Sequence, residues 1–315
     1  MSVTSSENSQ IIAVVGPTAS GKTALAVELA RLLDGEVISC DSVQVYKGMD
    51  IGSAKVSGEE MRGIPHHLID VIEPSGEFSC ADYAFLAKKA IDDIQSRGKR
   101  VVFCGGTGLY LDSVIGISGF SDAGKDEIFR AEMEKKTPSE LHAMLTAIDP
   151  VSAEAIHMNN VKRVIRALEI FHVTGKIKSA WDEQSRCIKP PYESVIIGLD
   201  FRNRQTLYDR IDRRVDIMLE SGLIDEVRGL DCEEFRASTA SDGIGYKEIL
   251  SYFDGYCSLD GAVALIKQAS RNYAKRQLTW FRRNKNVKWI YVDELCGEDK
   301  FKLIVNSAFD IINNN

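Results

Sequence analysis

The fold is decided by the stretch Ile11-Ile12-Ala13-Val14-Val15-Gly16-Pro17-Thr18-Ala19-Ser20-Gly21-Lys22-Thr23. The apolar residues 11–15 predict a short buried strand, and residues 24–33 have the apolar period of a helix. Between them, the pattern G-x-x-x-x-G-K-T at 16–23 predicts a phosphate-binding loop, or P-loop. The backbone N–H groups of such a loop and the N-terminus of the helix bind a phosphate or diphosphate. Lys22 is placed to reach the outer phosphates, and Thr23 is placed to ligate Mg²⁺.

The composition of the 315-residue chain, with 44% hydrophobic and 27% charged residues, is typical of a soluble globular protein. No apolar run approaches the roughly 18 residues of a membrane span, and residues 1–10 lack the apolar region of a signal peptide. The seven cysteines are scattered and form no C-x-x-C pair, which favours reduced thiols and excludes the usual zinc sites. We therefore expect a cytoplasmic protein that does not bind membranes.

Strand-like and helix-like segments alternate on both sides of a central region. Further strands are expected at 36–40, 100–104, 193–199 and 287–292, and helices at 79–96, 204–221, 223–230 and 263–281. This alternation predicts an α/β fold, a P-loop core in which a parallel sheet is flanked by helices on both faces. In the extended segment 65–70, His66 and His67 point to opposite sides of the chain, which favours a structural or substrate-lining role over a metal site.

The central region has a different character, with few β-branched clusters. Helices are expected there at 126–136, 139–147, 152–157 and 160–173, with Ser139 as an N-cap residue. The expected organisation is therefore a core built from residues 1–118 and 192–315, interrupted by an all-helical insertion at 119–191.

Two polar residues follow predicted strands directly. Asp41 follows the second strand, and Thr107 lies in the glycine-rich turn after the third. In an open α/β sheet, residues beyond the carboxyl ends of the strands face the ligand, so both are candidate site residues. The alternatives are an Asx turn at Asp41 and an ordinary turn residue at Thr107. Residues 43–55 have no helical period and are expected to form a functional loop.

The positive charge of the chain is concentrated in two places, although the net charge is −7. Residues 267–288 contain eight lysines and arginines and no acidic residue, with aromatic residues between them. Lys162, Arg163 and Arg166 share one face of a predicted helix. This pattern favours contact with a polyanion such as RNA, and the alternative is a solvated helix surface.

These motifs together resemble the bacterial tRNA dimethylallyltransferase family. The likeness rests on the P-loop and on D-S-V-Q-V-Y at 41–46, D-I-G-S-A-K at 50–55, P-H-H-L at 65–68, G-G-T-G-L-Y at 105–110, R-A-L-E at 166–169, I-G-Y-K-E at 244–248 and R-N-Y-A-K-R-Q at 271–277. It covers nearly the whole chain, and Ser53 and Val56 replace the usual threonine and proline. The resemblance implies transfer of a dimethylallyl group from dimethylallyl diphosphate to N6 of the adenine 3′-adjacent to the anticodon. The tRNAs concerned read codons that begin with U, and the products are N6-isopentenyladenosine and diphosphate.

The resemblance also implies roles for individual residues. The exocyclic amine of adenine is a poor nucleophile, so a carboxylate that accepts its proton, here Asp41, would act as general base. Thr107 would orient the adenine, while Lys22, Mg²⁺ on Thr23, Arg214 and Arg130 would stabilise charge on the diphosphate. For Arg214 a solvated helix cation is the alternative. The P-loop residues Gly16, Pro17, Thr18, Ala19, Ser20, Gly21, Lys22 and Thr23 would bind the diphosphate.

The implied partner is the anticodon stem-loop of tRNA, bound by a monomer with the target base extruded from its stack. The implied contacts are Asp41, Ser42, Val43, Gln44, Thr107, Arg130, Lys162, Arg163, Val164, Ile165, Arg166, Gly243, Ile244, Gly245, Tyr246 and Lys247. The helical insertion would then hold the anticodon stem.

Three other functions use some of the same features. A small-molecule or nucleoside kinase would use the P-loop for ATP but leaves the basic residues 267–288 unexplained. An isopentenyltransferase acting on free adenine nucleotide would need neither those residues nor the insertion. An RNA-binding regulator with a vestigial nucleotide site would not need Lys22, Thr23 and Asp41 together.

Overall fold

The structure, a computed structural model, describes residues 10–116, 124–186, 190–295, 297 and 299–314. Six strands in this part of the chain form one sheet in the order β3-β2-β4-β1-β5-β6, and every neighbouring pair is parallel. The strands are β1 (Ile11–Val15), β2 (Gly35–Cys40), β3 (His66–His67), β4 (Arg100–Gly105), β5 (Ser194–Asp200) and β6 (Lys288–Tyr291). The predicted parallel α/β sheet with flanking helices is confirmed.

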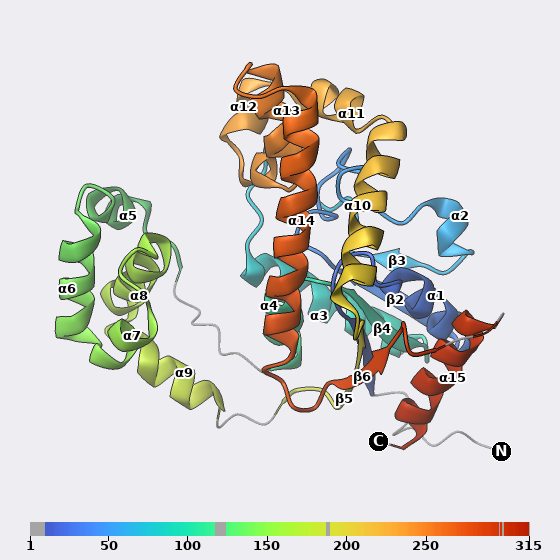
Figure 1. Cartoon of the computed structure of the whole chain (residues 1–315). Helices are drawn as coiled ribbons and strands as arrows, with labels where there is room; N and C mark the ends of the chain where they lie inside the picture. The colour runs from blue at the N-terminus through green and yellow to red at the C-terminus, as the bar shows by residue number, and fades with distance from the viewer. Residues whose placement is uncertain (1–9, 117–123, 187–189, 296, 298, 315) are drawn as a thin grey trace. The chain divides into compact units, whose positions relative to one another are not determined.

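The chain divides into two compact units. The first consists of Met1–Val114 and Tyr192–Asn315, and the second of Ile115–Pro191. Figure 1 shows the sheet and most helices in the first unit. Its helices are α1 (Lys22–Leu32), α2 (Gly58–Met61), α3 (Cys80–Ser96), α4 (Gly108–Ile115), α10 (Arg204–Glu220), α11 (Leu223–Leu230), α12 (Glu233–Ala237), the 3₁₀ helix η2 (Thr239–Asp242), α13 (Tyr246–Phe253), α14 (Leu259–Phe281) and α15 (Lys300–Asn313).

Neighbouring residues of β2 show how the two faces of the sheet are covered. Val37 belongs to the core that includes the apolar residues of α1 and α15. Glu36 points to the opposite face, where its buried carboxylate accepts hydrogen bonds from Arg97 at the end of α3. Because strand side chains alternate between faces, α1 and α3 lie on opposite sides of the sheet.

A second apolar core stabilises the end of the first unit that carries the site. It consists of residues from the loop after β2 and from helices α10, α11, α12, η2, α13 and α14, with Tyr46, Met49, Phe235 and Tyr246 among its larger members. Helices α10 and α14 contact each other (Figure 1).

The second unit contains α5 (Glu127–Met133), α6 (Pro138–Ile148), α7 (Pro150–Ala155), α8 (Val161–Thr174) and α9 (Lys178–Arg186) around its own apolar core. Two sequence predictions were wrong here. Thr137, not Ser139, caps α6, because its side chain accepts the Glu140 N–H while the Glu140 side chain accepts the Thr137 N–H. Helix α9 was not expected, since its residues are strongly polar.

Helix α15 was also missed, although its sequence carries a signal. Ile304, Val305, Ala308 and Ile312 recur at helical spacing and are buried in the main core against α1 and the sheet. Helix α14 begins at Leu259, four residues before the predicted start, because the Ser258 side chain accepts the N–H of Gly261 as an N-cap. No helix among the described residues is both long enough and apolar enough to cross a membrane.

Candidate active site

The P-loop connects β1 to α1 and requires glycine at both ends. Gly16 has φ 144°, and a Cβ at this position would lie 2.5 Å from the carbonyl oxygen of Leu199 in the neighbouring strand β5. Gly21 has φ 92° and precedes α1 directly. Within the loop, the Nζ of Lys22 donates a hydrogen bond of 2.7 Å to the carbonyl oxygen of Pro17. The buried Oγ of Ser20 has no hydrogen-bond partner within the described part of the chain.

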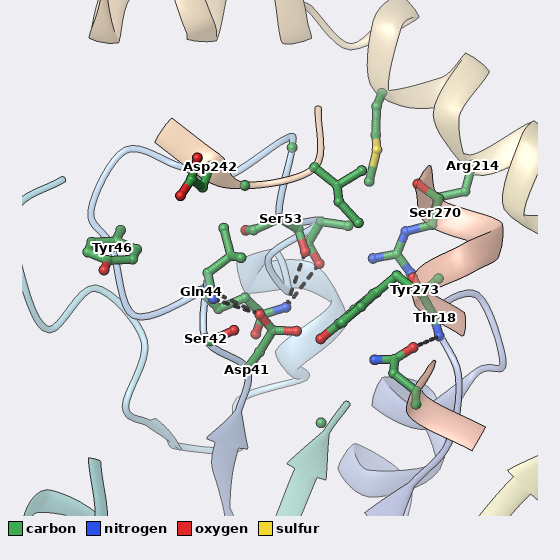
Figure 2. A pocket seen from close by; sticks show the side chains of 18 of the residues that line it. Thr18, Asp41, Ser42, Gln44, Tyr46, Ser53, Arg214, Asp242, Ser270 and Tyr273 are labelled. Carbon is green, nitrogen blue, oxygen red and sulfur yellow. Dashed lines mark hydrogen bonds between the residues drawn. The ribbon is translucent and has the colours of Figure 1, made fainter. Parts of the chain in front are cut away.

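A cavity of about 520 Å³ opens at the carboxyl ends of the strands, next to the P-loop (Figure 2). This volume lies within the range of about 300–1,000 Å³ that is usual for small-molecule sites. Six segments form most of its wall: the P-loop, the loop after β2, the end of β4, helix α10, helix α14 and residues 239–247. The lining residues used below are Thr18, Lys22, Thr23, Asp41, Ser42, Gln44, Arg214, Tyr273 and Gln277.

Thr107 is linked to Asp41 indirectly, by hydrogen bonds to Ser42, the residue that follows Asp41. The Oγ1 of Thr107 accepts the backbone N–H of Ser42 at 3.1 Å and donates to the Ser42 Oγ at 3.3 Å. One carboxylate oxygen of Asp41, Oδ1, accepts the backbone N–H of Val43 at 2.9 Å. Asp41 therefore does form the Asx turn that the sequence left open, yet it also lines the cavity. A structural role for Oδ1 leaves Oδ2 available for chemistry.

The loop after β2 is held by side chains from distant elements. The Glu226 carboxylate, on α11, accepts the backbone N–H groups of Asp50, Ile51 and Gly52 at 2.7–2.9 Å. It also accepts the hydroxyl of Tyr246 at 2.7 Å. These bonds fix residues 50–52 in one conformation, so the D-I-G-S-A-K segment is ordered by contacts outside itself.

Arg214 and Tyr273 enter the cavity from α10 and α14, and Figure 2 shows Tyr273 pointing toward Asp41. Burial lowers the pKa of Arg214 and raises the pKa of Tyr273 to about 12. Burial and, to a smaller extent, the charge of Arg214 lower the pKa of Lys22 to about 8. Two cations that share a partly desolvated site repel each other, which is the arrangement expected where an anionic ligand binds.

The basic residues 267–288 carry less available charge than the sequence suggested. Lys267 pairs with Asp216 at 2.6 Å, and Arg271 pairs with Asp212 at 2.5 Å, both across the contact between α14 and α10. Arg282 pairs with the buried Asp200 at 2.6 Å. Three more cations lie over aromatic rings: Lys275 over Tyr208, Arg276 over Tyr273 and Arg283 over Trp280. The acidic partners come from outside residues 267–288. A count of charges within this segment alone therefore overestimates the positive charge that is left to contact RNA.

In the helical insertion, two of the candidate arginines share a carboxylate. Arg130 Nε and Arg166 Nη1 lie 2.7 and 2.5 Å from the two oxygens of Glu169, whose side chain is fully buried. Burial opposes ionisation of Glu169, but the hydrogen bonds from Arg130, the Asp126 N–H and Arg166 outweigh it and lower its pKa to about 2. Arg130 thus lies in the second unit, bound to Glu169, and not among the residues that line the cavity.

The other candidate tRNA contacts differ in exposure. Lys162 and Arg163 are exposed, whereas Val164 and Ile165 are buried in the core of the insertion. In residues 243–247, Gly243, Ile244 and Lys247 line the cavity. Gly245 and Tyr246 are buried, and Tyr246 belongs to the second core of the first unit. The side chains of Val164, Ile165 and Tyr246 therefore support the shape of these segments and do not reach the surface.

The histidine pair of the 65–70 segment has a structural role. His67 Nε2 lies 2.7 Å from the Glu36 carboxylate, and His66 Nδ1 lies 2.8 Å from the carbonyl oxygen of Ile64. Neither residue lines the cavity.

No group of three potential metal-ligating His, Cys, Asp or Glu side chains occurs in the described ranges. Thr23 and Asp41 both line the cavity and offer the hard oxygen ligands that suit Mg²⁺, which is commonly held by few protein groups together with phosphate oxygens.

The sequence analysis did not identify Gln277, Tyr273 or Glu226 as site residues. Gln277 and Tyr273 lie one turn apart in the R-N-Y-A-K-R-Q motif, which was assigned to RNA contact because of its charges. These two residues could have been found from the sequence, because each places a polar group on the apolar face of α14. Glu226 carried no sequence signal, since its partners precede it by more than 170 residues.

Comparisons with known proteins agree with this geometry. The family model described as IPP transferase matches residues 44–284. The chain is 50% identical over 304 residues to the tRNA dimethylallyltransferase of Anoxybacillus flavithermus, covering 96% of each protein. It is 49% identical over 284 residues to the Bacillus subtilis enzyme of the same name, covering 89% of this chain and 90% of that one.

Two solved structures are also similar. The full-length tRNA isopentenylpyrophosphate transferase from Bacillus halodurans is 46% identical, with a TM-score of 0.72 and 97% of both chains covered. A eukaryotic dimethylallyltransferase acting on tRNA is 28% identical, with a TM-score of 0.81, covering 97% of this chain and 80% of that one. With the family model spanning most of the sequence and these relatives matching nearly end to end, the chain belongs to the IPP transferase family.

Proposed function

We propose that this protein is a tRNA dimethylallyltransferase that transfers a dimethylallyl group from dimethylallyl diphosphate to N6 of the adenine 3′-adjacent to the anticodon. The tRNAs concerned are those that read codons beginning with U. The observation that carries the proposal is one cavity lined both by the P-loop and by Asp41 and Ser42. A site for an anionic leaving group and a candidate base therefore share one space, in a member of the IPP transferase family.

The diphosphate end of the cavity is the cationic one. Lys22 lines the cavity from the P-loop, and Arg214 lines it from α10. As the bond between C1 of the dimethylallyl group and the diphosphate oxygen breaks, its electron pair moves to the diphosphate. Fixed cations and loop N–H groups stabilise that developing charge. We propose that Thr23 also holds Mg²⁺ there, which would supply further positive charge to the diphosphate.

At the proposed acceptor end Asp41 lines the cavity, and Thr107, which is not a lining residue, contacts the lining residue Ser42. As the lone pair of N6 forms the new bond to C1, one proton of the amine must leave, and Oδ2 of Asp41 is placed to accept it. The Thr107 hydroxyl, held by Ser42, is a fixed polar group beside this position. We propose that the bound substrates fill the cavity and so keep water away from an allylic cation.

The acceptor is proposed to reach this cavity as an extruded base of the tRNA anticodon loop. An adenine inside a stacked loop does not expose N6 to a carboxylate within the cavity, so extrusion is required. We propose that the exposed Lys162 and Arg163 of the insertion contact the phosphates of the stem, while the half-exposed Arg130 and Arg166 are ion-paired with Glu169.

Mass spectrometry of unmodified tRNA tests the proposal directly. The purified protein is incubated with tRNA and Mg²⁺ and with either dimethylallyl diphosphate or ATP. A five-carbon mass gain on one adenine beside the anticodon is expected in the first sample only. Consumption of ATP with phosphorylation of a small molecule, and no gain on tRNA, would instead identify a kinase. Modification of free adenine nucleotide in preference to tRNA would instead identify an isopentenyltransferase that acts on free nucleotides.

A further inference from the structure

The side chain of Gln277 connects the two ends of the cavity. Its Oε1 accepts the backbone N–H of Thr18 in the P-loop at 2.8 Å. Its Nε2 donates to the carbonyl oxygen of Gly106, the residue before Thr107, at 3.1 Å. Gln277 is only 4% exposed, so both bonds form away from solvent, where an unsatisfied amide would be costly. Figure 2 shows the bond to Thr18 as a dashed line beside Tyr273.

The two hydrogen bonds of Gln277, called the Gln277 bridge below, lie just beyond the point where the pairing of β1 and β4 ends. Strands β1 and β4 are paired as far as Val15 and Gly105. Beyond that pair the chains separate into the P-loop and the Thr107 turn. Gln277 therefore supplies a bond between the loops directly after the ladder of the sheet ends, and Thr107 continues the connection to Ser42, next to Asp41.

The surroundings leave little freedom for this bridge. A Cβ on Gly106 would lie 1.9 Å from the Nε2 of Gln277, so the amide packs directly on the turn. Helix α14, which carries Gln277, is fixed on both sides of that residue. Arg271 binds Asp212 on α10, and the Trp280 indole N–H donates to the buried Asp112 carboxylate of α4 at 2.9 Å.

We propose that Gln277 is a positioning residue that sets the spacing between the diphosphate and the acceptor amine, by tying the P-loop to the turn that carries Thr107. This inference rests on the proposed transfer reaction. Gln277 acts through the backbone of Thr18 and Gly106. Its loss therefore affects the alignment of the reacting atoms more than the binding of either substrate alone. A displacement of about 1 Å in such an alignment can lower a rate by ~10²-fold.

The first test separates kcat from KM. Gln277→Leu has a similar volume and makes neither hydrogen bond. Its kcat for dimethylallyl transfer to tRNA is expected to fall by ~10²-fold, with KM for both substrates close to that of the parent. An unchanged kcat, or a rise in KM alone, would overturn the inference. If the parent protein itself transfers no dimethylallyl group, the proposed function has failed instead.

The second test uses a conservative variant whose bridge depends on pH. In Gln277→Glu, the protonated acid accepts from Thr18 N–H and donates to the Gly106 oxygen. The carboxylate keeps only the first bond and repels that oxygen. Burial raises the pKa of such a carboxyl group, so the ratio of variant to parent kcat should fall as pH rises between about 5 and 9. The exposed Gln205→Glu, on α10, is the matched control and should give a flat ratio. A flat ratio for Gln277→Glu as well would contradict the proposal.

A third variant approaches the bridge from its other side. Gly106→Ala should displace the Gln277 amide because of the 1.9 Å contact. Its loss of kcat should therefore not add to that of Gln277→Ala in the double variant, since both remove one interaction. Additive losses would show that the two residues act separately and would overturn the bridge. Thermal unfolding of each variant establishes that the rates refer to folded protein.

Discussion

The Nζ of Lys22 lies 2.7 Å from the carbonyl oxygen of Pro17, so the cation of the P-loop donates a hydrogen bond to its own loop. The same group has its pKa lowered from 10.5 to about 8, chiefly by burial. The folded state therefore disfavours the charge on Lys22. That cost is fully present below pH 8 and disappears as the pH rises from 8 to 10.5.

Lys22→Met should accordingly separate stability from activity. At about pH 7 the variant, without diphosphate, is expected to unfold at the same temperature as the parent or higher, because it lacks the buried charge. The advantage should shrink at about pH 10, where the parent has lost this proton too. Transfer activity should fall by ~10²–10³-fold, since the leaving diphosphate would lose the cation that we propose the P-loop supplies. A less stable variant with full activity would contradict this interpretation.

Asp41 has two functions that can be separated by mutation. Asp41→Asn keeps the Oδ1 that accepts the Val43 N–H, so the turn should remain, but it removes the carboxylate that we propose takes the proton of N6. We expect normal binding of dimethylallyl diphosphate and a kcat lower by ~10²–10⁴-fold. Asp41→Ala should lose the turn as well and unfold at a lower temperature. Asp41→Asn with parental kcat would remove Asp41 as the base and leave the fold assignment unaffected.

Glu226 is expected to matter for stability although it lies outside the cavity. Glu226→Gln replaces an acceptor oxygen by an NH₂ group that faces N–H donors of residues 50–52. Leaving such partly buried donors unpaired should lower the free energy of unfolding by about 1 kcal/mol, measured by denaturant titration. The neighbouring Asp225, whose side chain is 81% exposed, provides the control. Asp225→Asn should change the value by less than about 0.5 kcal/mol. Equal effects of the two substitutions would show that the Glu226 contacts are not stabilising.

These cases show which parts of the site could be predicted from the sequence. The P-loop and the strand-end positions of Asp41 and Thr107 follow from patterns within a few residues, namely a glycine spacing and a buried strand. Glu226, by contrast, is bound to a loop that lies far away in the chain. The pairs of Lys267 and Arg271 with acids of α10 are equally non-local. Charge patterning describes one segment at a time, so it assigned to RNA several cations that the fold had already neutralised.

The salt dependence of tRNA binding should distinguish the exposed cations from the paired ones. Lys162→Gln and Arg163→Gln should each lower the slope of log K against log salt by about 0.7–0.9 if each side chain contacts one phosphate. Lys267→Gln removes a charge that Asp216 already neutralises, so its slope should stay near that of the parent. Unchanged slopes for both Lys162→Gln and Arg163→Gln would place the tRNA elsewhere on the protein.

Glu169 should control the acid stability of the helical insertion. Its pKa is lowered from 4.5 to about 2, so its contribution is present above pH 4.5 and lost as the pH falls toward 2. A shift of this size corresponds to about 3 kcal/mol. The protection factors of the α8 amides in hydrogen exchange, which correct for the intrinsic pH dependence of the exchange rate, should therefore fall in the parent as the pH drops through this range. In Glu169→Gln the protection factors should be lower than in the parent at about pH 7 and change little on acidification. The exposed Glu154→Gln, in the same unit, should behave like the parent. Parental protection in Glu169→Gln would mean that packing alone holds α8, and that the carboxylate shared by Arg130 and Arg166 serves only to orient them.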